Sequence, residues 1–184
     1  MIAYDPGVGG GLAMENLSGE IVVMPMPEHK IDKKKGVKKL TSKQFSMYQY
    51  ENLKKMIHTA SAITKETTVW MEAIGPRPAD TPRTSFSLSA NYHIALTLFR
   101  ECGLDVKLVS PQHWQNQLGR LVPSGSHNYE RRKKLFQDFA TEKFSETAGL
   151  YIQKDGVIKV RNNVKVTKKT ADALCILWVY SGRN

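Results

Sequence analysis

Apolar residues along this chain alternate between short runs and longer repeats of helical spacing, a pattern that predicts a mixed α/β fold. Three short apolar runs come first, at 1–7, 10–15 and 20–27. Each predicts a strand because it is short and is bounded by glycine, proline or polar residues. A helical repeat starts near Met47, and the β-branched run at 67–75 then predicts a buried strand. Strands followed by alternating helices and strands are typical of a sheet with helices on its faces.

The second half of the chain continues this alternation. Helical spacing predicts a helix over 86–104, followed by a strand and its exit over 105–114. An amphipathic pattern predicts a helix over 128–144, and a last helix is predicted from near Lys169 through Tyr180. We therefore expect a single α/β domain, residues 1–184, with a mixed five-stranded sheet flanked by helices.

Two segments interrupt the periodic pattern. Residues 28–46 include seven lysines without apolar periodicity and predict a basic loop, which either contacts phosphate groups or is a solvated linker. Residues 76–87 are rich in proline and predict a second loop. Asp155 lies in KDGV, a sequence typical of a hairpin turn.

The charge of the chain changes this picture more than its overall composition does. The 184 residues are 41% hydrophobic and 24% charged, which is ordinary for a globular domain. Lys and Arg total 27 against 17 Asp and Glu, so the net charge is +10. A basic protein attracts polyanions, and nucleic acid is therefore the first partner to consider ahead of a basic surface without a role.

Cysteine usage and the lack of long apolar runs predict the cellular compartment of the protein. Cys102 and Cys175 lie in apolar surroundings without a nearby metal-binding cluster and read as reduced core thiols. No apolar run approaches the roughly 20 residues that span a bilayer, so we expect no membrane segment. No signal or organellar targeting segment is visible ahead of the first strand, although a trimmed chain would not show one. We expect a cytoplasmic protein, in the host cytoplasm if the source is viral.

Three acidic residues stand at the ends of apolar segments. Asp5 follows the first run, Glu72 ends the run VWME, and Asp172 lies near the start of the last helix. Sites in such sheets form at strand ends, and three converging carboxylates repel one another unless a cation neutralises them. Ligands that are all oxygen favour Mg²⁺ or Mn²⁺ over zinc.

Several segments together resemble RuvC-type Holliday junction resolvases, especially their viral and organellar relatives. The segments are IAYDPGVGGGLA, VWMEAIG with the Pro- and Ser-containing stretch after it, FSLSANYHIALTLFRECGLDVKLVSPQHWQNQLG, RRKKLFQDFATEKF and TADALCILWVY. The resemblance covers most of the chain and implies a ribonuclease H-like fold. It also implies a homodimer that cuts four-way (Holliday) DNA junctions by paired, metal-dependent nicks.

The resemblance assigns Asp5, Glu72 and Asp172 as the catalytic acids that bind Mg²⁺ or Mn²⁺. Such resolvases commonly carry another acid one turn before the last one, whereas Lys168 and Lys169 occupy that region here. A lysine there either replaces part of a metal's charge, contacts the scissile phosphate, or forms a basic first turn without a catalytic role.

Recognition of branched DNA is expected from basic groups around the acids, since such DNA is distinguished mainly by shape and phosphate placement. Phe86 either stacks on an unpaired base or starts its helix as a core residue. The helix from Phe86 to Phe99 is the expected dimer seam, with His93 packed there or in the core. His113 and Trp114 are expected to anchor a turn. The candidate DNA-binding residues are Arg77, Arg83, Phe86, Arg131, Arg132, Lys133, Lys134, Lys168 and Lys169.

Three alternative functions remain open from the sequence. The glycines after Asp5 also suit a phosphate-binding turn of an actin-like enzyme, although 184 residues are too few for its usual paired domains. A non-catalytic DNA-binding module would keep the basic surface and tolerate the lysines near Asp172. A nuclease for other branched DNA, for flaps or for structured RNA would share every motif described above.

Overall fold

The computed structural model describes residues 1–7, 9–26, 47–75, 81–118, 129–144, 147–152 and 158–182. The predicted basic loop 28–46 and the turn at Asp155 lie outside these residues. Where the chain is described, no helix is long and apolar enough to cross a membrane.

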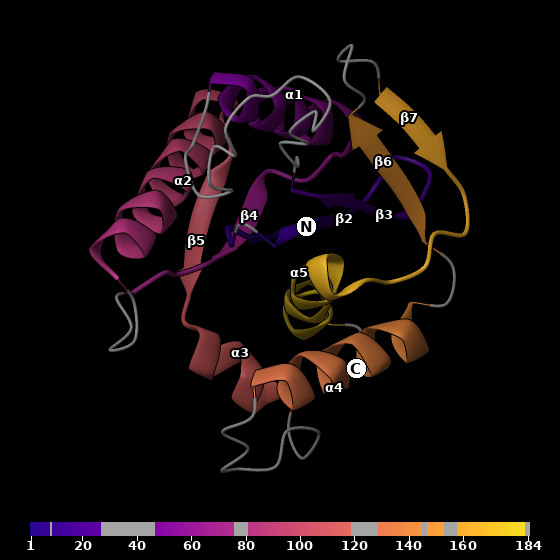
Figure 1. The fold of residues 1–184 in the computed structure, drawn as a ribbon. Helices are drawn as coiled ribbons and strands as arrows, with labels where there is room; N and C mark the ends of the chain where they lie inside the picture. Colours follow the sequence, from indigo (N-terminus) through magenta and orange to yellow (C-terminus); the bar gives the residue numbers. More distant parts are fainter. Residues whose placement is uncertain are drawn as a thin grey trace, which may run out of the picture.

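The described elements form an α/β fold around one mixed sheet (Figure 1). The strand order is β5-β4-β1-β2-β3-β6-β7, in which β1 pairs in parallel with β4 and antiparallel with β2. The strands are β1 (Ile2–Asp5), β2 (Gly11–Glu15), β3 (Ile21–Pro25), β4 (Thr68–Glu72), β5 (Asp105–Val109), β6 (Ala148–Ile152) and β7 (Ile158–Arg161).

The predicted count of five strands is wrong, because the described residues already form a sheet of seven. The five predicted strands are β1 to β5, and the additional two form an antiparallel pair that joins the sheet beside β3. β7 is short and lies at the edge, where Val160 is 62% exposed. Such a strand lacks the continuous apolar run that identifies a buried strand from sequence.

Helices cover both faces of the sheet (Figure 1). α1 (Met47–Ile63) and α2 (Pro82–Glu101) pack on one face, whereas α4 (Tyr129–Lys143) and α5 (Lys168–Tyr180) lie on the other. The short helix α3 (Pro111–Gln117) follows β5. These positions confirm the predicted helices and add α3, which sequence reasoning took for a turn.

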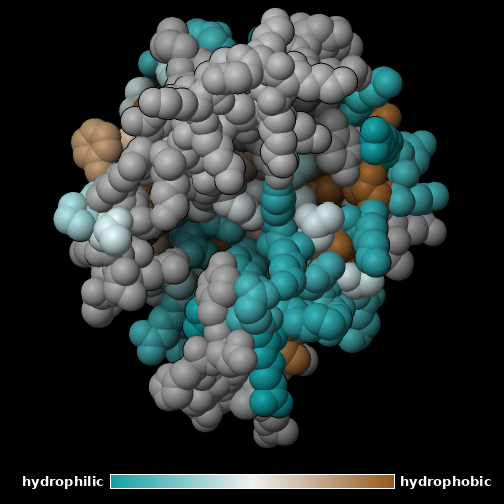
Figure 2. All heavy atoms as spheres, viewed as in Figure 1, coloured by the Kyte–Doolittle hydropathy of each residue, from teal (hydrophilic) through white to brown (hydrophobic). Residues whose placement is uncertain are grey.

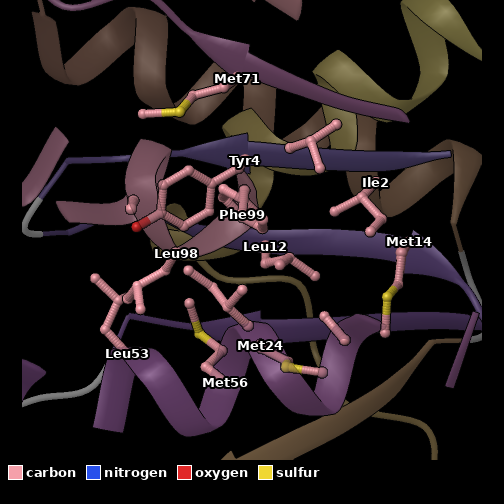
Figure 3. Close-up of a cluster of buried hydrophobic side chains, with 14 of the residues drawn as sticks. Ile2, Tyr4, Leu12, Met14, Met24, Leu53, Met56, Met71, Leu98 and Phe99 are labelled. Atoms are coloured by element: carbon pink, nitrogen blue, oxygen red, sulfur yellow. The ribbon is translucent and has the colours of Figure 1, made fainter. Parts of the chain in front are cut away.

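The face toward α1 and α2 is apolar and well packed. Figure 3 shows Tyr4 and Leu12 of the sheet in one cluster with Leu53 and Met56 of α1 and with Phe99 of α2. The Tyr4 and Phe99 rings meet edge to face, with centroids 5.1 Å apart. All these side chains are at most 1% exposed, so the α1–α2 layer anchors the strands that end at the acidic residues.

The opposite face lets α5 approach the strands closely. Ala3 and Ala13 are fully buried on this face, next to Gly11. A Cβ on Gly11 would lie 2.7 Å from the Met24 carbonyl oxygen and 3.2 Å from that of Lys169, so a larger residue would push α5 away. Small residues in β1 and β2 therefore bring the first turns of α5 to the edge where β1 ends.

The start of α2 corrects two predictions. The helix begins at Pro82, so the last part of the predicted loop 76–87 is helical, while 76–80 lie outside the described residues. Phe86 is 78% exposed, which makes its reading as a core residue wrong. His93 is exposed as well, and its ring meets that of Tyr92 at 5.2 Å.

Candidate active site

Asp5 and Glu72 lie side by side at one edge of the sheet. Asp5 is the last residue of β1 and Glu72 the last of β4, and these parallel neighbours are paired at Tyr4 and Met71 just before them. Asp172 reaches the same region from α5, which packs on both strands. All three acids are largely buried, with exposed fractions of 7%, 9% and 5%. The structure thus brings together the three acids predicted from sequence.

The turn after β1 fixes the Asp5 carboxylate. The backbone N–H of Gly7 donates to Asp5 Oδ1 at 2.9 Å, and the N–H of Gly10 donates to the Gly7 carbonyl at 2.8 Å. A Cβ at Gly10 would lie 2.6 Å from Asp5 Cγ and 2.2 Å from the Asp5 carbonyl oxygen. Glycine at position 10 is therefore required by close approach to Asp5, which gives this part of the glycine-rich stretch a direct role.

Glu72 is held by a tryptophan. The Trp114 indole N–H donates to Glu72 Oε2 at 3.0 Å, and Trp114 is fully buried between the sheet and Phe136 of α4. Burial raises the pKa of Glu72 from its ordinary 4.5 to about 8, and the charges of Asp5 and Asp172 add to this rise. The indole bond and Lys133 lower the pKa, but they do not offset burial and repulsion.

Asp172 has one paired and one unpaired oxygen. The Lys133 ammonium of α4 donates to Asp172 Oδ2, whereas Oδ1 is buried without a hydrogen-bond partner among the described residues. Burial and then the charge of Asp5 raise the pKa of Asp172 from 3.8 to about 6, and Lys133 acts in the opposite direction. A single lysine therefore compensates only part of the negative charge.

The chemistry of these groups fits a hard divalent cation. The donors are carboxylate oxygens, they repel one another, and Asp172 Oδ1 has no other partner. The side chains are not gathered into a ligand cage, since no group of three or more His, Cys, Asp or Glu residues in the described ranges is arranged to hold a metal ion. Asp5, Glu72 and Asp172 could thus ligate Mg²⁺ or Mn²⁺ after local adjustment of their side chains.

The predicted basic residues occupy different environments. Lys133 is only 16% exposed and faces Asp172, whereas Lys134 is 66% exposed and pairs with Asp138 one turn on. Lys168 pairs with Glu130 of α4, which ties the first turn of α5 to the start of that helix. Of the other candidates, Arg131 is exposed and Arg132 half-buried on α4, and Lys169 is half-buried at the start of α5. Phe86 is exposed on α2, where the side chain of Arg83 is not described. Arg77 lies outside the described residues.

Sequence reasoning missed two partners of the acids. Trp114 lies in α3, and its indole N–H donates to Glu72. Its role is therefore larger than anchoring a turn. Lys133 was grouped with the DNA-binding residues, although it lies three residues before Phe136 and seven before Ala140, both buried in α4. That helical spacing places Lys133 on the buried face of α4. The sequence could therefore have predicted that Lys133 has a partner inside the protein.

The mixed sheet with helices on both faces is similar to that of RuvC, in agreement with the ribonuclease H-like fold that the family resemblance implies. A solved structure of RuvC from T. thermophilus, in complex with a Holliday junction substrate, matches 98% of this chain and 92% of its own chain, with a TM-score of 0.56 and 12% identity. A second structure of Thermus thermophilus RuvC matches 98% and 93%, with a TM-score of 0.48 and 13% identity. No family model matches the sequence, and no curated protein does. At this identity the similarity shows a RuvC-like fold.

Proposed function

We propose that this protein is a metal-dependent, structure-selective endonuclease that resolves four-way DNA junctions by paired nicks. The observation that carries the proposal is the meeting of three buried carboxylates, Asp5, Glu72 and Asp172, at one edge of a RuvC-like fold. A net charge of +10 supports a polyanionic substrate. The RuvC structure with a Holliday junction makes a four-way junction the first substrate to test.

Asp5, Glu72 and Asp172 would hold the Mg²⁺ or Mn²⁺. When bound, the cation supplies Lewis-acid activation of water and neutralises charge that develops on the phosphate. The chain's own contribution is to keep the acids oriented: Gly7 binds Asp5 Oδ1, and Trp114 binds Glu72 Oε2. Lys133 keeps a positive charge beside Asp172 when no cation is present.

The basic residues around the acids would bind the DNA backbone. Arg131 and Lys134 are exposed on α4, where DNA phosphate groups can approach them. Lys168 and Lys169 begin α5 next to the acids and would contact phosphate near the cut. These assignments predict that removing a charge weakens junction binding without changing the metal requirement.

The direct experiment is cleavage of a labelled synthetic four-way junction. The purified protein is incubated with the junction, a matched linear duplex, a flap and a structured RNA, each with Mg²⁺, Mn²⁺ or EDTA, and cuts are located on denaturing gels. Symmetric metal-dependent nicks confined to the four-way junction are expected. Cuts mainly in the flap or the RNA would replace the resolvase assignment with the related nuclease.

Substitution of the acids tests the site itself. Asp5→Asn and Asp172→Asn should retain junction binding and lose cleavage, while Asp138→Asn, an exposed acid on α4, should cut at the normal rate. Cleavage by Asp5→Asn or Asp172→Asn at the normal rate would overturn the assignment.

One observation favours a second function, a non-catalytic module that binds branched DNA. The ammonium of Lys133 already pairs with Asp172, and Lys168 and Lys169 stand where related resolvases commonly carry another acid. Tight junction binding without any metal-dependent cut would support this module. In that case Lys168→Asp and Lys169→Asp would be the first changes made to restore cleavage.

We also propose a homodimer formed through α2. A four-way junction has near two-fold symmetry, so a two-fold dimer presents one active site to each of two opposed strands. Exposed Phe86 and His93 lie on the outward side of α2, while Ala95 and Phe99 of the same helix are buried against the sheet. Light scattering should give twice the monomer mass, and Phe86→Ser with His93→Glu should shift it toward the monomer. A monomer at all concentrations would contradict this proposal.

A further inference from the structure

The edge strand β7 presents basic residues on the face of the sheet that carries the acids. Residues 158–171 contain five Lys or Arg and no Asp or Glu. Lys159, Arg161 and Lys165 are all exposed. Hydrophilic residues, with hydrophobic ones between them, appear along the right of the molecule in Figure 2, where β7 lies in Figure 1.

The register of the sheet relates β7 to the strand that ends at Asp5. Asp5 pairs with Gly11, and Gly11 pairs with Pro25 across β2 and β3. Two residues earlier along β1, Ala3 pairs with Ala13 and Ala13 with Val23, and the row continues through Gly149 to Arg161. Arg161 therefore lies in the cross-strand row of Ala3, and Lys159 lies two residues from Arg161 toward the edge that carries Asp5.

Lys159 and Asp5 also share a face. Side chains directly opposite in a sheet point to the same side, and side chains two residues apart along a strand do so too. Ala3 and Val23 belong to the core beneath α5, and Asp5 is two residues after Ala3. Val23 pairs with Gly149, and Gly149 pairs with Arg161, so Arg161 projects on the α5 side. Lys159 is two residues from Arg161 on the same strand and projects on the same side. α5 packs on β1 to β4, and the β7 end of this face remains exposed.

The spacing suits a DNA backbone. Four strand-to-strand steps of about 4.8 Å separate β1 from β7, which gives roughly 19 Å across the sheet. One strand of B-DNA advances about 3.4 Å per phosphate, so this length corresponds to about five or six phosphates. A strand whose scissile phosphate lies at the acids would reach β7 about half a helical turn away.

We propose that Lys159 and Arg161 form a second phosphate-binding surface, the β7 surface, which holds one duplex arm of the substrate about five or six nucleotides from the cut. The proposal rests on the proposed function for the position of the cut. Its occupant is the DNA phosphate backbone, because two exposed cations on one face of an edge strand complement a polyanion. The surface would position an arm and read no bases.

A different explanation exists for charges on an edge strand. Lysines at a sheet edge discourage pairing with another chain and so prevent aggregation. That role depends on Lys159 and Arg161 being charged, but it predicts no effect on DNA. The two explanations are separated by measuring DNA binding and self-association on the same variant.

The test compares Lys159→Gln/Arg161→Gln with a charge-matched control, Lys55→Gln/Lys65→Gln. Lys55 is exposed on α1, which covers the other face of the sheet, and Lys65 is exposed in the segment between α1 and β4. Dissociation constants for a labelled four-way junction are measured in EDTA across a series of salt concentrations, and hydroxyl-radical footprints are recorded on the same junction. Sedimentation at the working concentration reports aggregation.

The β7 variant should bind about 3- to 10-fold more weakly near 100 mM salt, and its slope of log affinity against log salt should fall by about 2 relative to the control. Protection should be lost only about five or six nucleotides from the cut. An unchanged slope and footprint, with or without aggregation, would overturn the proposal. If the wild type binds but never cuts, and the slope still falls, the β7 surface stands while the resolvase assignment fails.

Discussion

The indole N–H of Trp114 donates to Glu72 Oε2 at 3.0 Å in a fully buried contact between α3 and the end of β4. This bond commits one carboxylate oxygen to the protein and would leave Oε1 for the proposed cation. Partners that orient a metal ligand typically contribute 10- to 100-fold to metal affinity or activity. The contact therefore gives Trp114, in the helix that follows β5, a role in orienting Glu72.

Replacing Trp114 by Phe should lower the cleavage rate about 10- to 100-fold while the junction dissociation constant in EDTA stays unchanged. The phenyl ring keeps most of the packing against Phe136 but cannot donate to Glu72. Steady-state cleavage and Mn²⁺ titration of the DNA-free protein are the measurements. Trp178→Phe is the matched control, because Trp178 contacts Phe139 and Phe144 rather than an acid. Equal rates in the two variants would contradict the positioning role.

Lys133 should stabilise the metal-free protein. Its ammonium is 16% exposed and pairs with Asp172, whose side chain is 8% exposed, so Lys133→Met leaves a buried carboxylate without its counter-charge. We expect a loss of about 2 kcal/mol or more in unfolding free energy, measured with urea in EDTA at pH 7.5. Lys134→Met removes an exposed pair with Asp138 and should cost less than about 1 kcal/mol. Similar losses in both variants would show that the Lys133 pair is no stronger than a surface pair.

The positions of the acids could be predicted from the sequence because the ends of buried strands can be predicted from it. An apolar run that stops at an acid predicts both the strand and the position of the acid, as at Asp5 and Glu72. Asp172 followed from the apolar repeat of the last helix and from the family resemblance. The observed parallel pairing of β1 and β4 confirms that the first two acids are neighbours.

The partners of the acids were harder to predict, since they depend on packing between distant segments. Trp114 is 42 residues from Glu72, and Lys133 is 39 residues from Asp172. No local pattern identifies such pairs, although Lys133 shares the helical phase of Phe136. β7 was missed because a short edge strand with exposed Lys159 and Arg161 has no buried face to reveal it, whereas β6 was missed although it is an apolar run with buried Leu150.

The raised pKa values predict that the metal-free protein loses stability as pH rises. Glu72 has an ordinary pKa of 4.5 and one of about 8 in the fold, so between these values the folded state binds a proton that the unfolded state has released. The stability that Glu72 contributes is fully present below about pH 4.5 and is lost as the pH rises to about 8. Asp172 lowers the stability in the same direction as the pH rises to about 6.

Glu72→Gln should therefore flatten the pH dependence. In EDTA the variant should be more stable than the wild type at pH 8 by about 1 kcal/mol or more, and the difference should shrink toward pH 5. Urea unfolding at pH 5, 6.5 and 8 checks this. Glu142→Gln, at a residue 71% exposed, is the control and should follow the wild-type curve. A Glu72→Gln curve parallel to the wild type would mean that Glu72 is ionised in the fold throughout this range.

Gly10 should be intolerant of any side chain because of Asp5. A Cβ at position 10 would lie 2.2 Å from the Asp5 carbonyl oxygen and 2.8 Å from Asp5 Oδ2, distances at which the backbone of the turn must shift. Gly10→Ala should therefore displace the carboxylate, reduce cleavage at least about 10-fold, and destabilise the fold by about 1 to 3 kcal/mol.

Gly9→Ala provides a close control for this change. A Cβ at Gly9 meets no atom within 4 Å, so alanine there should leave both cleavage and stability near the wild-type values. Cleavage assays and thermal unfolding of the two variants separate contact with Asp5 from a general need for glycine in the turn. If both variants lost activity equally, flexibility of the turn would matter more than the space beside Asp5. If neither did, the Asp5 carboxylate would tolerate displacement and its assignment as a metal ligand would be weakened.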